Sequence, residues 1–252
     1  MKLSVVILTC NQTAVTHRCL DSLTPLAGYF RDLRVIVVDN GSEDDTSVLI
    51  DDCRSELKSR LELIKLPENI GVAPGRNVGL KTCKDSDFVL ILDNDTIVLP
   101  GAIEALVDYM EANPATGLCA PRLESPDGRC QSSYKAFPGV MEKLRNIHGR
   151  SPYSGAIVDK PMEPFYVIGA CQMIRGEAMR KVGLLDDNIF FGPEDADYCM
   201  RIREAGYKVV YLPHIIIIHD WQRKSVKSPC SALSFHHMRG LLYFYRKWHR
   251  FI

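Results

Sequence analysis

Two carboxylates follow a strongly apolar segment of the chain. Asp93 and Asp95 come directly after residues 88–92, which read Phe-Val-Leu-Ile-Leu and are typical of a buried strand. A rigid strand that presents two oxygen ligands suits a hard divalent cation, whose remaining positions phosphate oxygens can fill. Aspartates separated by one residue occur at three places in this chain. A solvated turn after a strand is therefore the alternative explanation for any single pair.

An acid also ends a second apolar segment. Asp39 follows residues 35–38 and is succeeded by Asn40, Gly41 and Ser42. A carboxylate at the end of a strand can accept a hydrogen bond from the imide N–H of a uracil or thymine ring. The alternative is that these residues only turn the chain and cap the next helix.

Glycines and one arginine gather in residues 69–79. Gly71 and Gly75 flank Pro74 and allow the backbone to approach a ligand closely, and Arg76 can present a planar fork of N–H donors to a phosphate. A loop followed by the start of a helix explains the glycines equally well. The arginine is therefore the residue that favours a phosphate site here.

Three further acids, Glu194, Asp195 and Asp197, follow the sequence Phe-Phe-Gly-Pro. A carboxylate set against that apolar stretch can serve as a general base. The alternative is that acids at the N-terminus of a helix only stabilise the helix dipole. The residues alone leave both roles open.

His219 follows four consecutive isoleucines, residues 215–218. A histidine that ends a buried strand is commonly a hydrogen-bonded core residue. Its imidazole can also complete a metal site with Asp93 and Asp95. The sequence does not decide between the two.

Short apolar runs alternate along the chain with segments of helical period. Uninterrupted apolar runs that are spaced by helices predict an α/β fold with a Rossmann-like, mostly parallel central sheet flanked by helices. In such sheets ligands bind beyond the carboxyl ends of the strands, which is where Asp39, Asp93 and Asp95 lie. Strands are predicted at 3–8, 35–38, 61–66, 88–92, 165–168, 209–212 and 215–218, and helices at 14–23, 46–57, from 75, at 101–110, 176–182 and 194–205.

Length and composition are typical of a globular protein. The 252 residues include 31 basic and 31 acidic side chains, and 46% are hydrophobic, which argues against disorder. Nine cysteines, an odd number, predict reduced thiols and no disulfide framework. No apolar run approaches the roughly 18 residues that span a bilayer. We therefore expect a cytoplasmic protein.

The charge is concentrated at one end of the chain. Residues 221–252 contain seven basic residues and no acid. This basic aromatic tail can rest on an anionic membrane, peripherally on its inner face, or meet a lipid-diphosphate acceptor. A basic surface helix or a homodimer contact is the alternative. No nucleic acid partner is expected, because no recognised fold element accompanies the charge.

Six segments between Leu3 and Asp220 carry a resemblance to a known family. They read SVVILTCNQ, VIVVDNGSEDDT, NIGVAPGRNVG, FVLILDNDTIVLPGA, IGACQMIRGEAMRKVGLLDDNIFFGPEDADYCMRIREAGY and IIIIHD. Each could arise by chance, whereas all six in this order are specific. Together they resemble glycosyltransferase family 2, the inverting enzymes with the glycosyltransferase-A fold, and in particular its rhamnosyltransferase-like branch.

The resemblance implies roles for particular residues. The donor nucleotide sugar would be contacted by residues at the strand ends and the glycine-rich loop, namely Thr9, Asn11, Asp39, Gly41, Asn69, Arg76, Asp93 and Asn94. A divalent cation, Mn²⁺ or Mg²⁺, would be ligated by Asp93, Asp95 and His219. Asp195 corresponds to the catalytic base, and the acceptor would meet Glu194, Gly169 and Ala170.

The implied activity is a metal-dependent, inverting transfer of a sugar. Asp195 would take a proton from an acceptor hydroxyl while that oxygen displaces the nucleoside diphosphate in one step. We expect a UDP- or dTDP-sugar donor and a glycan or lipid-linked saccharide acceptor, in cell-surface polysaccharide biosynthesis. The alternative is a sugar-nucleotide-binding subunit that has no turnover of its own.

A domain organisation follows from the same resemblance. Residues 1–220 would form the catalytic domain, with a nucleotide-sugar-binding half at 1–123 and an acceptor half at 165–220. Between them, residues 124–164 lack periodicity and predict a variable insertion or flap. Residues 221–252 would form a helical basic extension.

Overall fold

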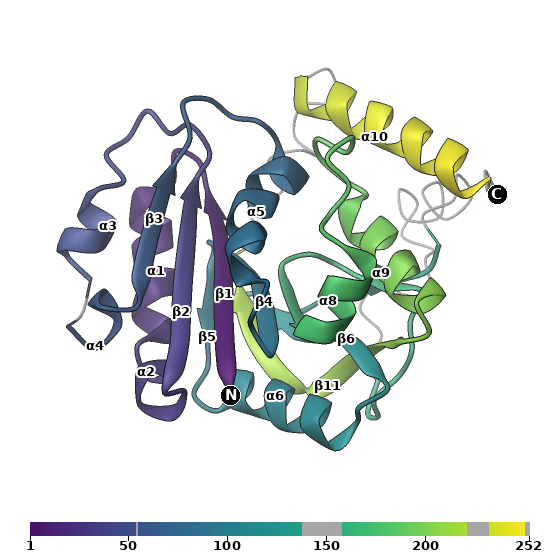
Figure 1. Cartoon of the computed structure of the whole chain (residues 1–252), viewed down its shortest axis with the longest axis horizontal. Helices are drawn as coiled ribbons and strands as arrows, with labels where there is room; N and C mark the ends of the chain where they lie inside the picture. Colours follow the sequence, from purple (N-terminus) through teal and green to yellow (C-terminus); the bar gives the residue numbers. More distant parts are fainter. Residues whose placement is uncertain (54, 138–157, 221–231, 250–252) are drawn as a thin grey trace.

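The computed structural model describes residues 1–249 apart from residue 54 and residues 138–157 and 221–231. A curled central sheet runs through the molecule with helices on both of its faces, and a C-terminal helix lies across one end (Figure 1). The predicted α/β architecture, with helices on both sides of the sheet and a helical tail, is confirmed.

The N-terminal half of the sheet is parallel. Three of its strands, β1 (Lys2–Thr9), β2 (Asp32–Asp39) and β4 (Phe88–Asp93), are almost wholly buried, as a sheet covered on two sides requires. Strands β2 and β4 pair with β1 on its two sides, and β3 (Leu61–Lys65) pairs with β2 at the edge. The parallel arrangement predicted for these segments is confirmed.

The C-terminal half of the sheet is mixed. Strand β10 (Cys171–Arg175) lies antiparallel between β4 and β6 (Thr116–Glu124), and β11 (Lys208–His219) runs parallel to β6. The short strands β5 (Thr96–Val98) and β7 (Cys130–Gln131) pair with β11 and β6. Within the described residues the sheet has nine strands, and β8 (Tyr134–Lys135) with β9 (Tyr166–Val167) forms a separate pair.

The prediction of two strands at 209–212 and 215–218 was wrong. They are one strand, β11, whose register against β6 shifts between Leu212 and Ile216. Pro213 lies inside this irregularity and has no N–H to donate to a neighbouring strand. A local bulge accommodates it without ending the strand. The strand therefore continues as far as His219.

The prediction of one helix at 46–57 was also wrong. The segment contains two single turns, α3 (Val48–Asp51) and α4 (Ser55–Lys58). Before the first turn, the Thr46 hydroxyl donates to Asp39 and the Ser47 hydroxyl donates to Asp45. Such side-chain bonds compete with helix formation, so the first turn begins only at Val48.

The other helices lie close to their predicted positions. Helices α1 (Thr13–Leu23) and α6 (Ala102–Ala112) cover one face of the sheet, with short α2 (Leu26–Tyr29) beside α1. Helices α5 (Val72–Leu80), α8 (Gly176–Val182) and α9 (Glu194–Glu204) cover the other face, and the turn η1 (Lys81–Cys83) follows α5. Alternate residues of β1 enter the two cores: Val5 and Ile7 pack under α1 and α6, and Val6 packs under α5.

Helix α10 (Ala232–Trp248) forms the C-terminal tail and has a small core of its own. Its Leu241, Phe244 and Tyr245 pack against Ala196 and Met200 of α9. Residues 138–157 of the predicted insertion and 221–231 and 250–252 of the predicted extension lie outside the described residues. Elsewhere in the chain, no helix has both the length and the apolar composition needed to cross a bilayer.

Candidate functional site

The carboxyl ends of three neighbouring strands meet at one edge of the sheet. Thr9 of β1 lies opposite Asp39 of β2, and Leu8 lies opposite Asp93 of β4. The loops that follow these strands therefore begin side by side. The juxtaposition predicted from the apolar runs is confirmed, and the residues that follow them lie at a common edge.

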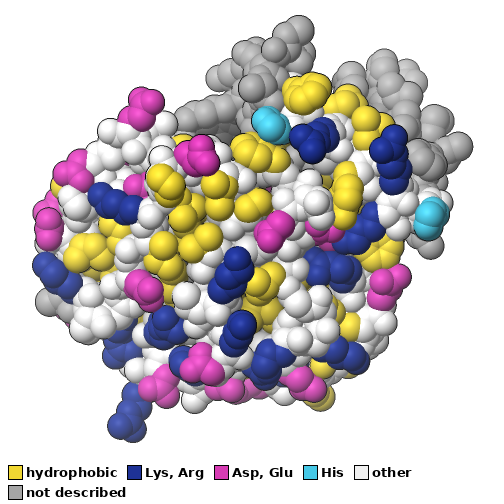
Figure 2. Space-filling model, turned by 45° about the horizontal axis from the view of Figure 1, so that its top comes forward, with side chains coloured by type: hydrophobic (Ala, Val, Ile, Leu, Met, Phe, Trp, Pro, Cys, Tyr) yellow, Lys and Arg dark blue, Asp and Glu magenta, His cyan; other side chains and the backbone are white. Residues whose placement is uncertain are grey.

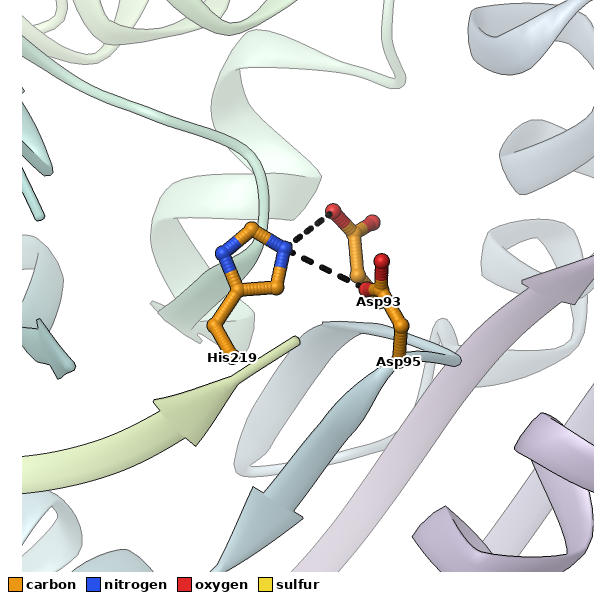
Figure 3. A group of neighbouring side chains, drawn as sticks. All are labelled: Asp93, Asp95 and His219. Atoms are coloured by element: carbon orange, nitrogen blue, oxygen red, sulfur yellow. Dashed lines mark ion pairs between the residues drawn. The ribbon is translucent and has the colours of Figure 1, made fainter. Parts of the chain in front are cut away.

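Asp93, Asp95 and His219 form a compact cluster at this edge. One ligand atom from each lies within 4.8 Å of the others. The Nε2 atom of His219 is 3.2 Å from Asp95 Oδ1 and 4.0 Å from Asp93 Oδ2 (Figure 3). Pairing of β11 with β5, which sets His219 opposite Thr96, brings the imidazole to the aspartates. The three predicted metal ligands thus lie together although they come from distant parts of the chain.

Gln131 orients the imidazole and was not predicted. Its Oε1 lies 2.8 Å from His219 Nδ1, and its Nε2 donates to the His219 carbonyl oxygen at 2.7 Å. With Nδ1 donating to Gln131, Nε2 is the ring nitrogen that faces the aspartates and the one that could ligate a metal in their place as hydrogen-bond partners. Gln131 lies in β7, inside the segment predicted as a variable insertion. No spacing in the sequence links it to His219.

The donor set of this cluster fits a divalent cation. Two carboxylates and one imidazole are typical ligands for Mn²⁺ and are compatible with Mg²⁺. Burial raises the pKa of Asp93, Arg76 opposes this effect, and the nearby Asp95 carboxylate adds to it. Burial lowers the pKa of His219, but hydrogen bonding to Asp95 and the surrounding negative charge raise it overall. A positive charge at this position would therefore be stabilised.

Arg76 connects the cluster to the first turn of α9. Its Nη2 bonds Asp93 and also donates to the Gly169 carbonyl oxygen at 3.1 Å, and its Nη1 lies 3.5 Å from Glu194 Oε1. The arginine side chain is only 6% exposed. Arg76 Nε and Glu194 Oε2 have no hydrogen-bond partner among the described residues. One donor and one acceptor are thus unused beside a buried ion pair.

Asp195 has the properties of a base that titrates near neutrality. Its Oδ1 accepts the Ala196 N–H at 2.7 Å, and its Oδ2 accepts the Gly169 N–H at 3.3 Å. Burial raises the pKa of Asp195 to about 7, and the adjacent Glu194 carboxylate contributes to the increase. A carboxyl with such a pKa can accept a proton and release it again at cellular pH.

The backbone of Gly169 and Ala170 joins these groups. Gly169 bonds both Arg76 and Asp195, and the Ala170 carbonyl oxygen accepts the Asp93 N–H at 2.8 Å. A Cβ atom added to Gly169 would lie 2.7 Å from Arg76 Nη1, so a larger residue here would displace the guanidinium. The predicted contact of the two residues with an acceptor stays a prediction.

Two predicted donor-binding residues are buried in a hydrogen-bond network. The Thr9 hydroxyl lies 2.8 Å from that of Thr16. The Asn94 amide donates to Gln12 Oε1 and to the Thr16 hydroxyl, both at 3.0 Å. These bonds attach α1 to the edge of the sheet. Contact of Thr9 or Asn94 with a donor stays a prediction.

The remaining donor-binding candidates stabilise neighbouring loops. Asp39 accepts the Ser42 N–H on one oxygen and the Thr46 hydroxyl on the other, and Asn11 Oδ1 accepts the Glu43 N–H.

Asn69 and Gly41 bring a further loop to the same edge. Asn69 Oδ1 accepts bonds from the Asn40 amide and the Gly71 N–H. Gly41 has a positive φ of 73°, and a Cβ atom there would lie 2.4 Å from the carbonyl carbon of Glu68. The loops after β2 and β3 are thus held together by Asn40, Gly41 and Asn69, and contact of Gly41 or Asn69 with a donor stays a prediction.

Residues 4–183 match the family model described as Glycosyl transferase family 2. An N-acetylglucosaminyl-diphospho-decaprenol L-rhamnosyltransferase of Mycobacterium tuberculosis is 26% identical over 227 residues, which cover 82% of this chain and 73% of the relative. A pre-mycofactocin glycosyltransferase of the same species is 32% identical over 227 residues, covering 86% and 42%. The dTDP-rhamnosyl transferase RfbF of Shigella flexneri is 26% identical over 202 residues, covering 77% and 62%.

Solved glycosyltransferases share the fold. A mannosyltransferase from Pyrobaculum calidifontis in complex with GDP-Man and Mn²⁺ superposes with a TM-score of 0.63 at 19% identity, covering 88% of this chain and 58% of that one. TarS of S. aureus gives a TM-score of 0.64 at 18% identity, covering 94% and 41%. The chain therefore spans about half the length of these two structures.

Proposed function

Since the chain belongs to glycosyl transferase family 2, we propose that it transfers a sugar from a nucleoside diphosphate to an acceptor hydroxyl, with inversion at the anomeric carbon. The observation that carries this proposal is the position of Arg76. Its guanidinium contacts Asp93 of the candidate cation site on one side and Glu194, next to Asp195, on the other. The proposed cation ligands and the proposed general base therefore lie on opposite sides of the buried Arg76 guanidinium.

The donor in this proposal is a UDP- or dTDP-sugar. Each carboxylate oxygen of Asp39 already accepts one hydrogen bond, but a carboxylate oxygen has two lone pairs and can accept another. The imide N–H of uracil or thymine is a donor that suits it. Asn11, Gly41 and Asn69 border the same edge and are the proposed neighbours of the nucleotide.

Asp93, Asp95 and His219 are the proposed ligands of Mn²⁺ or Mg²⁺. When bound there, the cation would supply positive charge that stabilises the departing diphosphate. Gln131 keeps the His219 tautomer suitable for this role. Arg76 adds a second, permanent positive charge at the same place.

Asp195 is the proposed general base. It takes the proton of the acceptor hydroxyl as that oxygen forms a bond to the anomeric carbon and the bond to the nucleoside diphosphate breaks. The raised pKa of Asp195 suits this task, because a base is most effective when its pKa lies near the working pH. Glu194, with its unused Oε2, is the proposed partner of the acceptor hydroxyl.

The acceptor in this proposal is a glycan or a lipid-linked saccharide of a cell-surface polysaccharide. The name of the Mycobacterium relative supports this chemical class, because it gives an N-acetylglucosaminyl-diphospho-decaprenol as the substrate of that enzyme. A sugar-nucleotide-binding subunit without turnover is the competing function. A base poised to titrate near neutrality argues against it, since binding alone does not need one.

Asp195→Asn tests the proposal. The variant should bind UDP- or dTDP-sugars with unchanged affinity, measured as a thermal shift in the presence of Mn²⁺. The rates of sugar transfer and of donor hydrolysis should both decrease by about 10²–10⁴-fold, which is the usual contribution of a general base. Asp127→Asn is the matched control, because that aspartate is more than half exposed. Full turnover by Asp195→Asn would remove Asp195 from the mechanism, and a wild-type chain that binds donor without releasing nucleoside diphosphate would favour the binding subunit.

A further inference from the structure

The outward face of α10 carries a stripe of apolar and basic side chains. Phe235, Met238 and Leu242 are 69%, 58% and 51% exposed, and Arg239 and Arg246 are exposed beside them. At 3.6 residues per turn these five positions fall within about 100° of the helix circumference and extend over about 17 Å. We refer to these five residues as the α10 stripe.

The opposite face of α10 is occupied by the protein itself. Leu241 and Phe244 are buried against α9. Gly240 lies so close to the loop before α9 that an added Cβ would be 2.4 Å from the Gly192 carbonyl oxygen. The apolar character of the stripe is therefore not needed for the fold of this chain.

Buried ion pairs hold α10 in this orientation. Lys247 Nζ lies 2.7 Å from both Asp186 and Asp197, and Trp248 Nε1 donates to Asp197 at 2.9 Å. Asp197 is fully buried; its Oδ1 takes the two contacts from α10, and its Oδ2 pairs with Arg201 Nε at 3.0 Å. The α10 stripe is thus a fixed part of the surface.

Exposed apolar side chains are concentrated on this helix. In the part of the chain that the structure describes, six large hydrophobic side chains are exposed, and three of them belong to the stripe. Hydrophobic and basic side chains gather over this part of the molecule (Figure 2). No acid occurs anywhere in residues 221–252.

We propose that the α10 stripe docks on an anionic lipid surface. A helix with apolar residues and arginines on one face lies in the plane of a bilayer, with its apolar groups below the headgroups and its cations at the phosphates. A second copy of the chain fits the α10 stripe less well than an anionic lipid surface does. A symmetric contact along this stripe would bring Arg239 and Arg246 toward their own counterparts, with no acid on the helix to compensate them.

Docking of the α10 stripe would also place the candidate active site close to the lipid surface. His236 of α10 stacks on Phe190 with ring centroids 4.0 Å apart, and the Phe190 carbonyl oxygen accepts the Val72 N–H at the start of α5. The loop that contains Phe190 leads directly into Glu194 and Asp195. A lipid surface against α10 would therefore lie near the catalytic groups, which suits a lipid-linked acceptor. This last step rests on the proposed function, whereas the docking does not.

Vesicle flotation of the full chain, without substrates, tests the docking. The chain should float with vesicles made of equal parts phosphatidylcholine and phosphatidylglycerol and not with phosphatidylcholine alone. Replacing both arginines of the stripe (R239Q with R246Q) should lower the partition coefficient roughly 30-fold, at about fivefold for each charge. Replacing the three apolar residues (F235S, M238S, L242S) should lower it by about tenfold or more.

Matched controls use exposed residues elsewhere. Arg18→Gln with Arg129→Gln, and separately Tyr29→Ser, should leave flotation unchanged, because these side chains are 62%, 82% and 56% exposed but lie outside α10. Equal flotation with both vesicle types, or flotation that the stripe variants do not reduce, would overturn the proposal. So would a dimer in sedimentation velocity that the stripe variants abolish. Donor hydrolysis should be unchanged in the stripe variants, so a failure of docking can be told apart from a failure of the proposed reaction.

Discussion

The transfer rate should increase with pH through about 7, because Asp195 must be ionised to accept a proton. Burial raises the pKa of Asp195 from its ordinary 3.8 to about 7, and Glu194 adds to the effect. With that pKa, about a tenth of the carboxyl groups are ionised at about pH 6 and about nine tenths at about pH 8. The turnover number should therefore increase about tenfold between these two values if proton transfer limits the rate.

The assay is release of nucleoside diphosphate at saturating donor and acceptor, measured across this pH range. Glu194→Gln removes one of the causes of the raised pKa, so the midpoint of its pH profile should move to lower pH. The activity that remains in Asp195→Asn should lack this rise. A wild-type profile that is flat from about pH 5 to about pH 8, or a midpoint near the ordinary value of an aspartate, would refute the assignment.

Ionisation of Asp195, which should increase the transfer rate, should lower the stability of the fold. A group whose pKa is higher in the folded state than in the unfolded state holds its proton more tightly when folded, so ionisation destabilises the fold. Stability should therefore fall as pH rises from about 4 to about 7, by at most about 4 kcal/mol for the difference between 3.8 and about 7. Asp195→Asn should melt above wild type at about pH 8 and close to it at about pH 4. A difference in Tm that does not change with pH would contradict this expectation.

Three further substitutions test the packing around the site. Arg76→Met should lower the free energy of unfolding by about 3 kcal/mol in urea titration, because it leaves the buried Glu194 carboxylate without its cation and removes one partner of the partly exposed Asp93. A negligible loss would contradict the buried ion pair. Gln131→Leu should weaken Mn²⁺ binding about 10–100-fold by calorimetry, because it releases the imidazole that it orients, and unchanged affinity would speak against that role. Gly240→Ala should lower the free energy of unfolding by about 1–3 kcal/mol, because the added Cβ would overlap the Gly192 carbonyl oxygen. Gly28→Ala is the control, because a Cβ there meets no atom within 4 Å. Equal effects of the two substitutions would contradict the close packing of α10.

The sequence by itself determined the local elements that carry the site. The apolar runs of β1, β2 and β4 are long enough, and regular enough, to predict buried parallel strands, and the polar residues after them fall at one edge for that reason. The aspartates of the candidate cation site were predicted for the same reason, whereas the acids at the start of α9 were singled out because they follow Phe-Phe-Gly-Pro. These features depend on neighbours a few residues apart, which a single chain displays directly.

Local pattern was not enough where the chain is irregular. Strands β6 and β10 were not predicted: Gly117 and Pro121 interrupt the first, and the second, Cys171–Arg175, has no clear alternation. The two halves of β11 were predicted as separate strands because Pro213 is a residue that commonly ends a strand. In the fold, each of these strands is stabilised by its partners in the sheet and not by its own pattern.

Only the tertiary structure decided how the charged groups pair. Arg76, predicted as a phosphate ligand, lies between Asp93 and Glu194, and Gln131 meets His219 from a segment with no recognisable pattern. The physical reason is that burial and electrostatic partnership depend on which distant segments the sheet brings together. A buried charge takes the partners that surround it in space, and the order of residues along the chain does not contain that information.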